Sequence, residues 1–298
     1  MRTVIFMMLA GACLLARIAP GFGQESKVAG AAGTTQEYVF KKTPQGELKM
    51  YVQFPKDWTS GDKRPAVVFF FGGAWRMGSA AQFIPQADYF AGRGLVTARA
   101  DYRIRSKHRT TPDKCVEDAK SALRWVRKNA AALGIDPDRI VGSGGSAGGH
   151  IAACAALIDG FEGKEEDPAV SSRPNLLVLF NPVFDLTAIK IPDMDGKDVA
   201  RAISPILFVK KSAPPAILFY GTQDKFLAQG EAFLAKSKPL GNRVELFAAK
   251  GQPHGFFNRP PWTQATLQKA DEFLLSLGYL KGEPTVRVPA GAELNKDN

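Results

Sequence analysis

The most informative stretch of the chain is RIVGSGGSAGGH, residues 139–150. Residues 139–142 predict a short strand, and the apolar run 147–158 predicts a helix. Between them lies the pattern Gly-x-Ser-x-Gly, centred on Ser146. A serine on so sharp a turn needs small neighbours, a need that Gly144 and Gly148 meet. The pattern predicts that Ser146 is a nucleophile above the carboxyl ends of the strands, where open α/β sheets bind ligands.

Two other interpretations of this stretch compete with the nucleophile. The chain has 29 Gly, so the pattern can be an accidental glycine-rich turn. Residues 142–146 also superficially resemble a phosphate-binding loop. That loop is disfavoured because no Gly-Lys-Ser/Thr ending follows, and no acidic residue stands about 20 positions later at a strand end.

Apolar and amphipathic runs alternate on both sides of this stretch. The alternation predicts right-handed βαβ units and an α/β fold, with a mostly parallel sheet of about eight strands and helices on both faces. An opening hairpin adds an antiparallel edge. We expect one domain over residues 37–280, with a small lid or loop at 185–213. The expected strands are 38–42, 48–54, 66–71, 95–101, 139–142, 176–180, 216–220 and 243–249, and the expected helices are 81–92, 112–133, 147–158, 231–238 and 264–277.

The general base has only three candidates, because the chain contains three His. His254 lies in a loop after the last strand, where this architecture places its base. His150 follows Ser146 on the same helix and is expected to pack or to be hydrogen-bonded, and nothing orients His108 in its basic loop. The acid should fall between serine and histidine in chain order. Asp224 is the first candidate and Asp185 the second; the acid orients the imidazole, which takes the serine proton.

A glycine pair after an early strand provides a candidate oxyanion hole. The predicted strand 66–71 runs into Gly72-Gly73-Ala74-Trp75. The N–H groups of Gly73 and Ala74, with that of Ala147, are expected to bind the oxyanion of a tetrahedral intermediate. Trp75 is expected either to line the substrate pocket or to pack in the core.

Four motifs in this order resemble the α/β-hydrolase fold esterases: GGAW (72–75), GGSAGGH (144–150), GTQD (221–224) and PHGFF (253–257). The chain is most similar to the bacterial bifunctional feruloyl/acetylxylan esterase group, with hormone-sensitive-lipase-like esterases as neighbours. The resemblance spans roughly residues 38–280. It implies a serine carboxylesterase that removes acetyl or feruloyl groups from polysaccharide through an acyl-enzyme.

Two residues depart from the family pattern. Phe71 stands where the family usually has a histidine before the oxyanion glycines, and Gly145 stands where lipase-like relatives carry aspartate. Gly145, and the few residues before strand 66–71, argue against a large N-terminal cap. An uncapped site suits a bulky, polymer-borne ester.

The N-terminus resembles a secretory signal peptide, residues 1–23. We therefore expect a secreted or periplasmic protein, with a linker at 24–36 and a polar, frayed tail at 281–298. Cys13 follows an apolar stretch, but the lipobox is weak, and an uncleaved anchor is the alternative. Of the Cys that remain after cleavage, Cys115 and Cys154 are expected to be buried thiols, although export permits a disulfide.

Composition places the chain among ordinary globular proteins, with 45% hydrophobic and 23% charged residues. The formal charge is +10, and the densest basic cluster, 103–109, is expected to be a solvated loop because no nucleic-acid module surrounds it. We expect no metal, no cofactor, no nucleic-acid partner and no membrane insertion once the signal is removed. Two other functions stay open: an amidase or peptidase with the same triad, and a non-catalytic binding protein.

Overall fold

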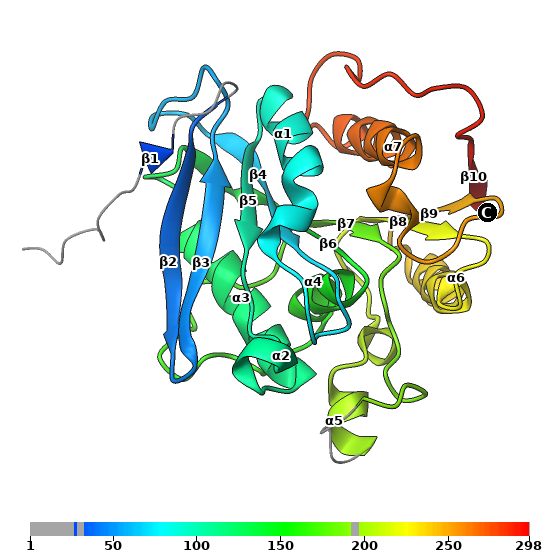
Figure 1. The fold of residues 1–298 in the computed structure, drawn as a ribbon, viewed down its shortest axis with the longest axis horizontal. Helices are drawn as coiled ribbons and strands as arrows, with labels where there is room; N and C mark the ends of the chain where they lie inside the picture. The colour runs from blue at the N-terminus through cyan, green and yellow to red at the C-terminus, as the bar shows by residue number, and fades with distance from the viewer. Residues whose placement is uncertain (1–26, 29–32, 192–196, 298) are drawn as a thin grey trace, which may run out of the picture.

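A computed structural model describes residues 27–28, 33–191 and 197–297, and Figure 1 shows its fold. The predicted signal peptide, residues 1–23, lies outside the described residues. The strands are β1 (Lys27–Val28), β2 (Thr35–Thr43), β3 (Gly46–Gln53), β4 (Arg64–Phe70), β5 (Val96–Ala100), β6 (Ile135–Gly145), β7 (Leu176–Phe180), β8 (Ala216–Gly221), β9 (Val244–Ala249) and β10 (Leu294–Asp297). The helices are α1 (Ile84–Gly92), α2 (Arg105–His108), α3 (Pro112–Lys128), α4 (Ala147–Leu157), α5 (Lys197–Ala202), α6 (Leu227–Ser237) and α7 (Trp262–Ser276). Four short 3-10 turns are η1 (Ala80–Phe83), η2 (Pro205–Phe208), η3 (Lys238–Leu240) and η4 (Phe256–Asn258).

The described residues form one ten-stranded sheet in the order β1-β2-β3-β5-β4-β6-β7-β8-β9-β10. The strands from β5 to β9 in this order run parallel. The hairpin β2–β3 pairs antiparallel with β5. This is the α/β-hydrolase architecture that the sequence predicts. The two strands beyond the expected eight are short edge strands, β1 and β10.

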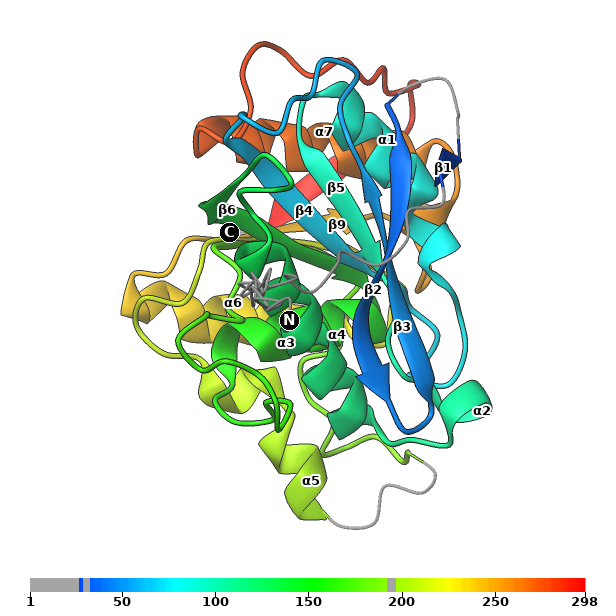
Figure 2. The same cartoon turned by 90° about the vertical axis from the view of Figure 1, so that its left-hand side faces the viewer.

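Helices cover both faces of the sheet, as the alternating pattern predicts. Side chains of α1 and α7 join one core cluster, and side chains of α3, α4 and α6 join the other. Figures 1 and 2 show α1 and α7 on the upper side and the other three on the lower side. Neighbouring residues of β4 divide between the clusters, with Val67 and Phe69 on one face and Val68 and Phe70 on the other. A strand buried on both faces explains the unbroken apolar run.

Both ends of the sheet differ from the sequence prediction. Lys27–Val28, inside the expected linker, pairs with Gln36 and Thr35, and β2 begins within that linker. The prediction of a frayed end is wrong for residues 294–297, which pair antiparallel with β9. Lys296 Nζ lies 2.8 Å from Glu245 Oε2 on β9. Polar β10 forms because β9 would otherwise leave an unpaired edge, a tertiary cause that local sequence does not reveal.

The basic cluster 103–109 is not simply a solvated loop. Arg103 is buried, and its Nε donates to Asp118 Oδ2 at 2.8 Å. His108 is buried too, and its Nδ1 accepts the N–H of Ile104 at 2.9 Å. Residues 105–108 form the short helix α2. The solvated interpretation fails because a carboxylate on α3 neutralises the first arginine inside the protein.

Helix α3 is shorter than predicted and ends at Lys128 instead of Leu133. The side chain of Asn129 donates to Trp125 O at 2.8 Å, a local bond that competes with helical hydrogen bonding. Gly134 then has a φ of 61°, and its N–H donates to Ala131 O. Within the described residues, no helix has the length and apolar character needed to cross a bilayer.

Candidate active site

Ser146 sits on a strained turn between β6 and α4, with φ 52° and ψ −117°. Its N–H donates to Phe180 O on β7 at 2.9 Å. A Cβ built on Gly144 would lie 2.5 Å from the carbonyl carbon of Gly148, and one built on Gly148 would lie 2.0 Å from Phe70 O. The strained backbone conformation of Ser146 costs about 1–3 kcal/mol and persists only where the surrounding structure holds it in place. The structure thus explains why residues 144 and 148 must be glycine.

The structure brings Ser146, His254 and Asp224 together. His254 Nε2 lies 2.8 Å from Ser146 Oγ, and His254 Nδ1 lies 2.7 Å from Asp224 Oδ2. The Asp224 side chain is fully buried, whereas that of His254 is 34% exposed. The second carboxylate oxygen, Oδ1, accepts the N–H of Phe226 at 2.9 Å. A buried carboxylate therefore holds one ring nitrogen, and the other faces the serine hydroxyl at an open surface.

Two of the other candidates, Asp185 and His150, have hydrogen-bond partners outside this group. Asp185 Oδ1 accepts the N–H and the hydroxyl of Thr187 at 2.8 and 2.6 Å. His150 is fully buried; its Nε2 lies 2.6 Å from Ile203 O, and its Nδ1 accepts the indole N–H of Trp75 at 3.1 Å. Burial lowers the pKa of His150 to about 4, so the ring is neutral. The expectation that His150 is hydrogen-bonded inside the protein is confirmed.

The glycine loop after β4 lies directly beside Ser146. A Cβ built on Gly72 would be 3.4 Å from Ser146 Cβ, an ordinary contact distance, and 3.0 Å from Gly145 O, which is tight. Gly73 has a φ of 129°, and Ala74 and Trp75 have φ of 55° and 57°. These positive values turn the loop back on itself, and Met77 N–H donates to Gly73 O at 3.0 Å. Among the described residues, no backbone acceptor is recorded for the N–H of Gly73 or Ala74.

Phe71 supports this loop where the family pattern has histidine. Its ring stacks on Tyr102 at a centroid distance of 4.1 Å, and its carbonyl accepts the Tyr102 hydroxyl at 2.7 Å. Trp75 packs edge-on against the His150 ring, is only 5% exposed, and also lines a neighbouring pocket. The structure shows Trp75 packed in the core, and its role in the substrate pocket stays a prediction.

The family is evident from comparison with known proteins. The model of the BD-FAE family, the bifunctional feruloyl/acetylxylan esterases, matches residues 50–238. The chain belongs to this family. Two solved structures of esterase 2 from the planctomycete Thermogutta terrifontis resemble this BD-FAE protein. The propionate-bound form has TM-score 0.79 and 43% identity over 85% of this chain and 97% of that one; the form phosphorylated by paraoxon has TM-score 0.78 and 42% identity over 90% and 100%.

Curated relatives of this BD-FAE member are also named esterases. A probable isoprenylcysteine alpha-carbonyl methylesterase of Oryza sativa subsp. japonica is 31% identical over 72% of this chain and 56% of its own length. Esterase LipQ of Mycobacterium tuberculosis is 30% identical over 68% of this chain and 52% of its own length. The chain spans about half the length of these two relatives.

Two polar residues that sequence reasoning missed connect the site loops of this BD-FAE member. Asn181 is buried, its Oδ1 accepts the N–H of Gly255 at 3.0 Å, and its Nδ2 lies 3.4 Å from His254 Nε2. Gln82 Oε1 accepts the N–H of Gly72 at 2.6 Å, and its Nε2 donates to Asn258 Oδ1 at 3.1 Å. A signal existed only for Asn181, which directly follows a predicted strand at the edge where Ser146 lies.

Phe226 adds an aromatic contact to the site. Its ring lies edge-on to the His254 ring, with centroids 5.3 Å apart. The free thiols of Cys115 and Cys154 are buried, and burial raises the pKa of both. The expectation of two buried thiols is confirmed.

Among residues 27–28, 33–191 and 197–297, no cluster of His, Cys, Asp and Glu has the arrangement of a metal site.

Proposed function

We propose that this BD-FAE member is a serine carboxylesterase that hydrolyses esters through a covalent acyl-enzyme. One observation carries the proposal: Ser146 Oγ, on the strained turn, lies 2.8 Å from a ring nitrogen of His254, whose other nitrogen lies 2.7 Å from buried Asp224. A nucleophile within hydrogen-bond reach of a base, itself oriented by a third group, is the arrangement that acyl transfer requires.

Acylation follows from this geometry. Ser146 Oγ attacks the ester carbonyl carbon while His254 Nε2 takes the hydroxyl proton. The carbonyl electron pair moves onto oxygen, and the N–H groups of Gly73, Ala74 and Ala147 bind the resulting oxyanion. Each such donor typically lowers the barrier by about 2.7–4 kcal/mol. The intermediate then collapses, the bond to the leaving oxygen breaks, and His254 returns the proton to the departing alcohol.

Deacylation repeats these steps with water. His254 Nε2 accepts a proton from water as the water oxygen attacks the acyl carbon, and the same donors bind the oxyanion. The bond from the acyl carbon to Ser146 Oγ breaks, and His254 gives its proton to the serine. The products are a carboxylic acid and the free enzyme. Asp224 stays ionised, holds Nδ1–H and stabilises the transient imidazolium.

For the substrate, we propose acetyl or feruloyl esters carried by a polysaccharide outside the cytoplasm. The family match supports the acyl groups, and the exposed part of the His254 side chain supports a site open to a bulky alcohol. The signal-like segment 1–23 supports export. We expect the protein to be exported and its N-terminal sequence to begin near Gln24. An intact N-terminus on protein that stays in the cytoplasm would contradict export.

The experiment compares the mature protein with Ser146→Ala and with Ser60→Ala, a control at an exposed serine. The panel contains p-nitrophenyl esters from acetate to octanoate, methyl ferulate, acetylated xylan and p-nitroacetanilide. We expect Ser146→Ala to lose about a millionfold in kcat and Ser60→Ala to match the wild type. Paraoxon should phosphorylate the wild type at Ser146.

Each outcome separates the candidate functions. Ester hydrolysis that Ser146→Ala retains in full contradicts the proposal. Activity on the anilide alone replaces the esterase with an amidase. A folded wild type that neither hydrolyses any substrate nor reacts with paraoxon is a non-catalytic binding protein.

A further inference from the structure

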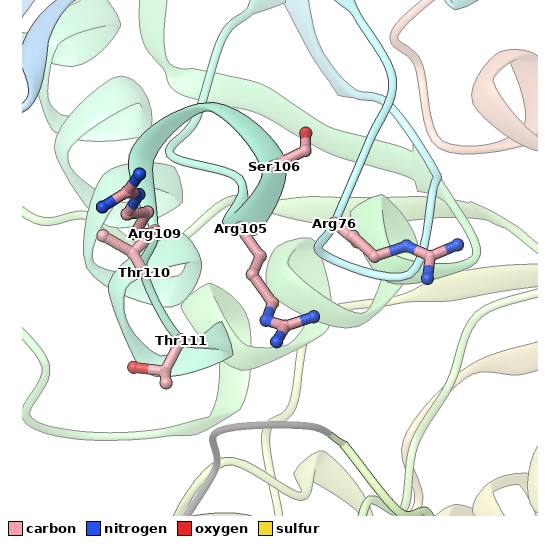
Figure 3. Close-up of a pocket in the computed structure, with 6 residues that line it drawn as sticks. All are labelled: Arg76, Arg105, Ser106, Arg109, Thr110 and Thr111. Carbon is pink, nitrogen blue, oxygen red and sulfur yellow. The ribbon is translucent and has the colours of Figure 1, made fainter.

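The glycine loop, residues 72–78, is attached to the helix α2 at its middle. Arg105 N–H donates to Trp75 O at 3.0 Å. Ser106 N–H donates to Arg76 O at 3.1 Å, and Figure 3 shows Arg76 on the loop segment beside that helix. The inner end of the loop, which lies next to the reactive serine, is held by a different element.

Gln82, in the turn η1, holds the inner end of the glycine loop. Its Oε1 accepts the N–H of Gly72 at 2.6 Å. A Cβ built on Gly72 would lie 3.4 Å from Ser146 Cβ and 3.6 Å from Gln82 Oε1, so this bond lies close to the serine. Because a backbone N–H only donates, the bond also sets the orientation of the side-chain amide, with Nε2 turned away from the loop.

Asn258, the last residue of the turn η4, is the next partner of this amide. Gln82 Nε2 donates to Asn258 Oδ1 at 3.1 Å. Asn258 Nδ2 donates in turn to Gly255 O at 3.0 Å, and the backbone N–H of Asn258 donates to the same carbonyl at 3.2 Å. A carbonyl only accepts, so the orientation of the Asn258 amide is set as well. Gly255 directly follows His254, and the link therefore ends beside the base.

The bonds of this link all point from the glycine loop toward the histidine loop, residues 250–258. A flip of either side-chain amide would bring like groups face to face at both of its ends. Successive bonds that share one direction polarise and strengthen one another. The N–H of Gly255 also donates to Asn181 Oδ1 at 3.0 Å, so both polar groups of that glycine are bound. The link therefore favours one position of the two loops relative to each other.

Apolar packing joins the same two turns. The rings of Phe83 and Phe257 stack with centroids 5.8 Å apart, and these residues adjoin the two linked amides in sequence. A Cβ built on Gly145 would lie 2.6 Å from Phe257 Cζ and 3.4 Å from Phe83 Cζ, so the stack lies directly beside the serine turn. Apolar contact is not directional, whereas a hydrogen bond weakens steeply when its angle changes. The stack thus holds the turns together, and the amides set their register.

We infer that Gln82 and Asn258 are positioning residues that keep the glycine loop, with its proposed oxyanion donors, in register with His254. This inference rests on the proposed esterase function. Both hydrolytic steps need the two loops at the same moment, because a proton moves to His254 while negative charge develops at the oxyanion donors. An interaction needed only in the transition state changes kcat, so loss of the link should lower kcat and leave KM nearly unchanged.

The test is a double-mutant cycle with Gln82→Met, Asn258→Ala and the variant that carries both substitutions. Gln45→Met is the matched control, because Gln45 is an exposed glutamine in the turn between β2 and β3. The constants kcat and KM are measured for p-nitrophenyl acetate per active site that paraoxon titrates, so protein that fails to fold does not count. Urea midpoints are measured on the same preparations.

We expect kcat to fall about tenfold in Gln82→Met and in Asn258→Ala, less than the hundredfold that a misplacement of about 1 Å costs. KM should stay within about threefold of the wild type. The double variant should lie within about twofold of Gln82→Met alone, because both substitutions break one link. Gln45→Met should match the wild type.

Three results overturn the inference and leave the esterase intact. The first is an unchanged kcat per titrated site in both single variants, even with lower urea midpoints, since a purely structural role gives that result. The second is losses that multiply in the double variant, and the third is losses that fall on KM alone. A wild type that neither hydrolyses the ester nor reacts with paraoxon overturns the proposed function and this inference together.

Discussion

Gly148→Ala tests whether close packing couples the position of the Ser146 turn to that of the glycine loop after β4. A Cβ at position 148 would lie 2.0 Å from Phe70 O and 2.4 Å from Phe71 O. Real Cβ contacts are essentially never shorter than 3.0 Å, and both neighbours are backbone atoms, so the end of β4 must move by about 1 Å. Overpacking of this kind lowers the free energy of unfolding by roughly 1–3 kcal/mol.

The same displacement should reduce activity. Phe71 leads directly into Gly72, which lies beside Ser146 and precedes the proposed oxyanion donors Gly73 and Ala74. A misplacement of about 1 Å is enough to lower the rate on the order of a hundredfold. We expect Gly148→Ala to lose about a hundredfold in kcat/KM on p-nitrophenyl acetate, and its urea midpoint to fall.

Gly92→Ala is the matched control. Gly92 is the last residue of α1, and a Cβ built on it meets nothing within 4 Å. Both substitutions remove the same flexibility from the unfolded chain, so the difference between them isolates the contact with the β4 carbonyls. We expect Gly92→Ala to gain up to about 1 kcal/mol and to keep its kcat/KM. Equal midpoints and equal activities for the two variants would refute this reasoning.

Two further predictions concern the acid and a buried histidine. Asp224→Asn should lower kcat by about 10⁴-fold, because an amide stabilises neither the imidazolium nor the required tautomer. The control Asp185→Asn should stay within a few-fold of the wild type. Similar losses in both variants would contradict Asp224 as the acid. Unfolding in urea should become easier as the pH falls from 7 to 5, because the pKa of His150 is about 4 when folded against 6.5 when unfolded, so the unfolded chain binds the extra proton. His150 should lower the free energy of unfolding by about 2 kcal/mol at pH 5, and most of this loss should persist in His108→Gln. A free energy of unfolding that does not change between pH 7 and 5.5 would contradict the prediction.

Sequence alone could place the reactive groups because strand order and chain order constrain them together. Ser146, Asp224 and His254 each lie within five residues after a strand whose apolar run is easy to recognise. Parallel strands end at one edge of the sheet, so polar residues just after such strands meet there. The same logic puts Asp224 first but leaves Asp185 as a second candidate, since both follow strands in the required order. The path of each loop decides between them, and that is a tertiary property.

The supports of the site were not predictable for a different reason. Gln82 reaches Gly72 from a 3-10 turn ten residues away, and no local pattern marks it as a partner. Phe71 replaces a family histidine, and its role becomes clear only from the stacked Tyr102 ring. The helix α2 has four residues and lacks the periodicity that reveals longer helices.

Asn181 shows how the sheet geometry creates the need for such a support. The adjacent strands β6, β7, β8 and β9 end near Ser146, Asn181, Asp224 and His254 in turn. Three strand spacings place the end of β9 about 14 Å from the end of β6. The loop after β9 must therefore return across β8 and β7 before His254 can approach the serine.

The hydrogen bond from the N–H of Gly255 to Asn181 Oδ1 holds this loop near the end of β7, two of the three strand spacings along that path. A bond at the next residue fixes the imidazole more tightly than one further along the chain, since fewer backbone dihedrals separate the anchor from the ring. Asp224 then needs only to orient the ring, not to position its loop. The Asn181 amide thus positions the loop, and the buried Asp224 carboxylate orients the ring. Together they keep the serine, the imidazole and the acid in line while 34% of the His254 side chain remains exposed for substrate.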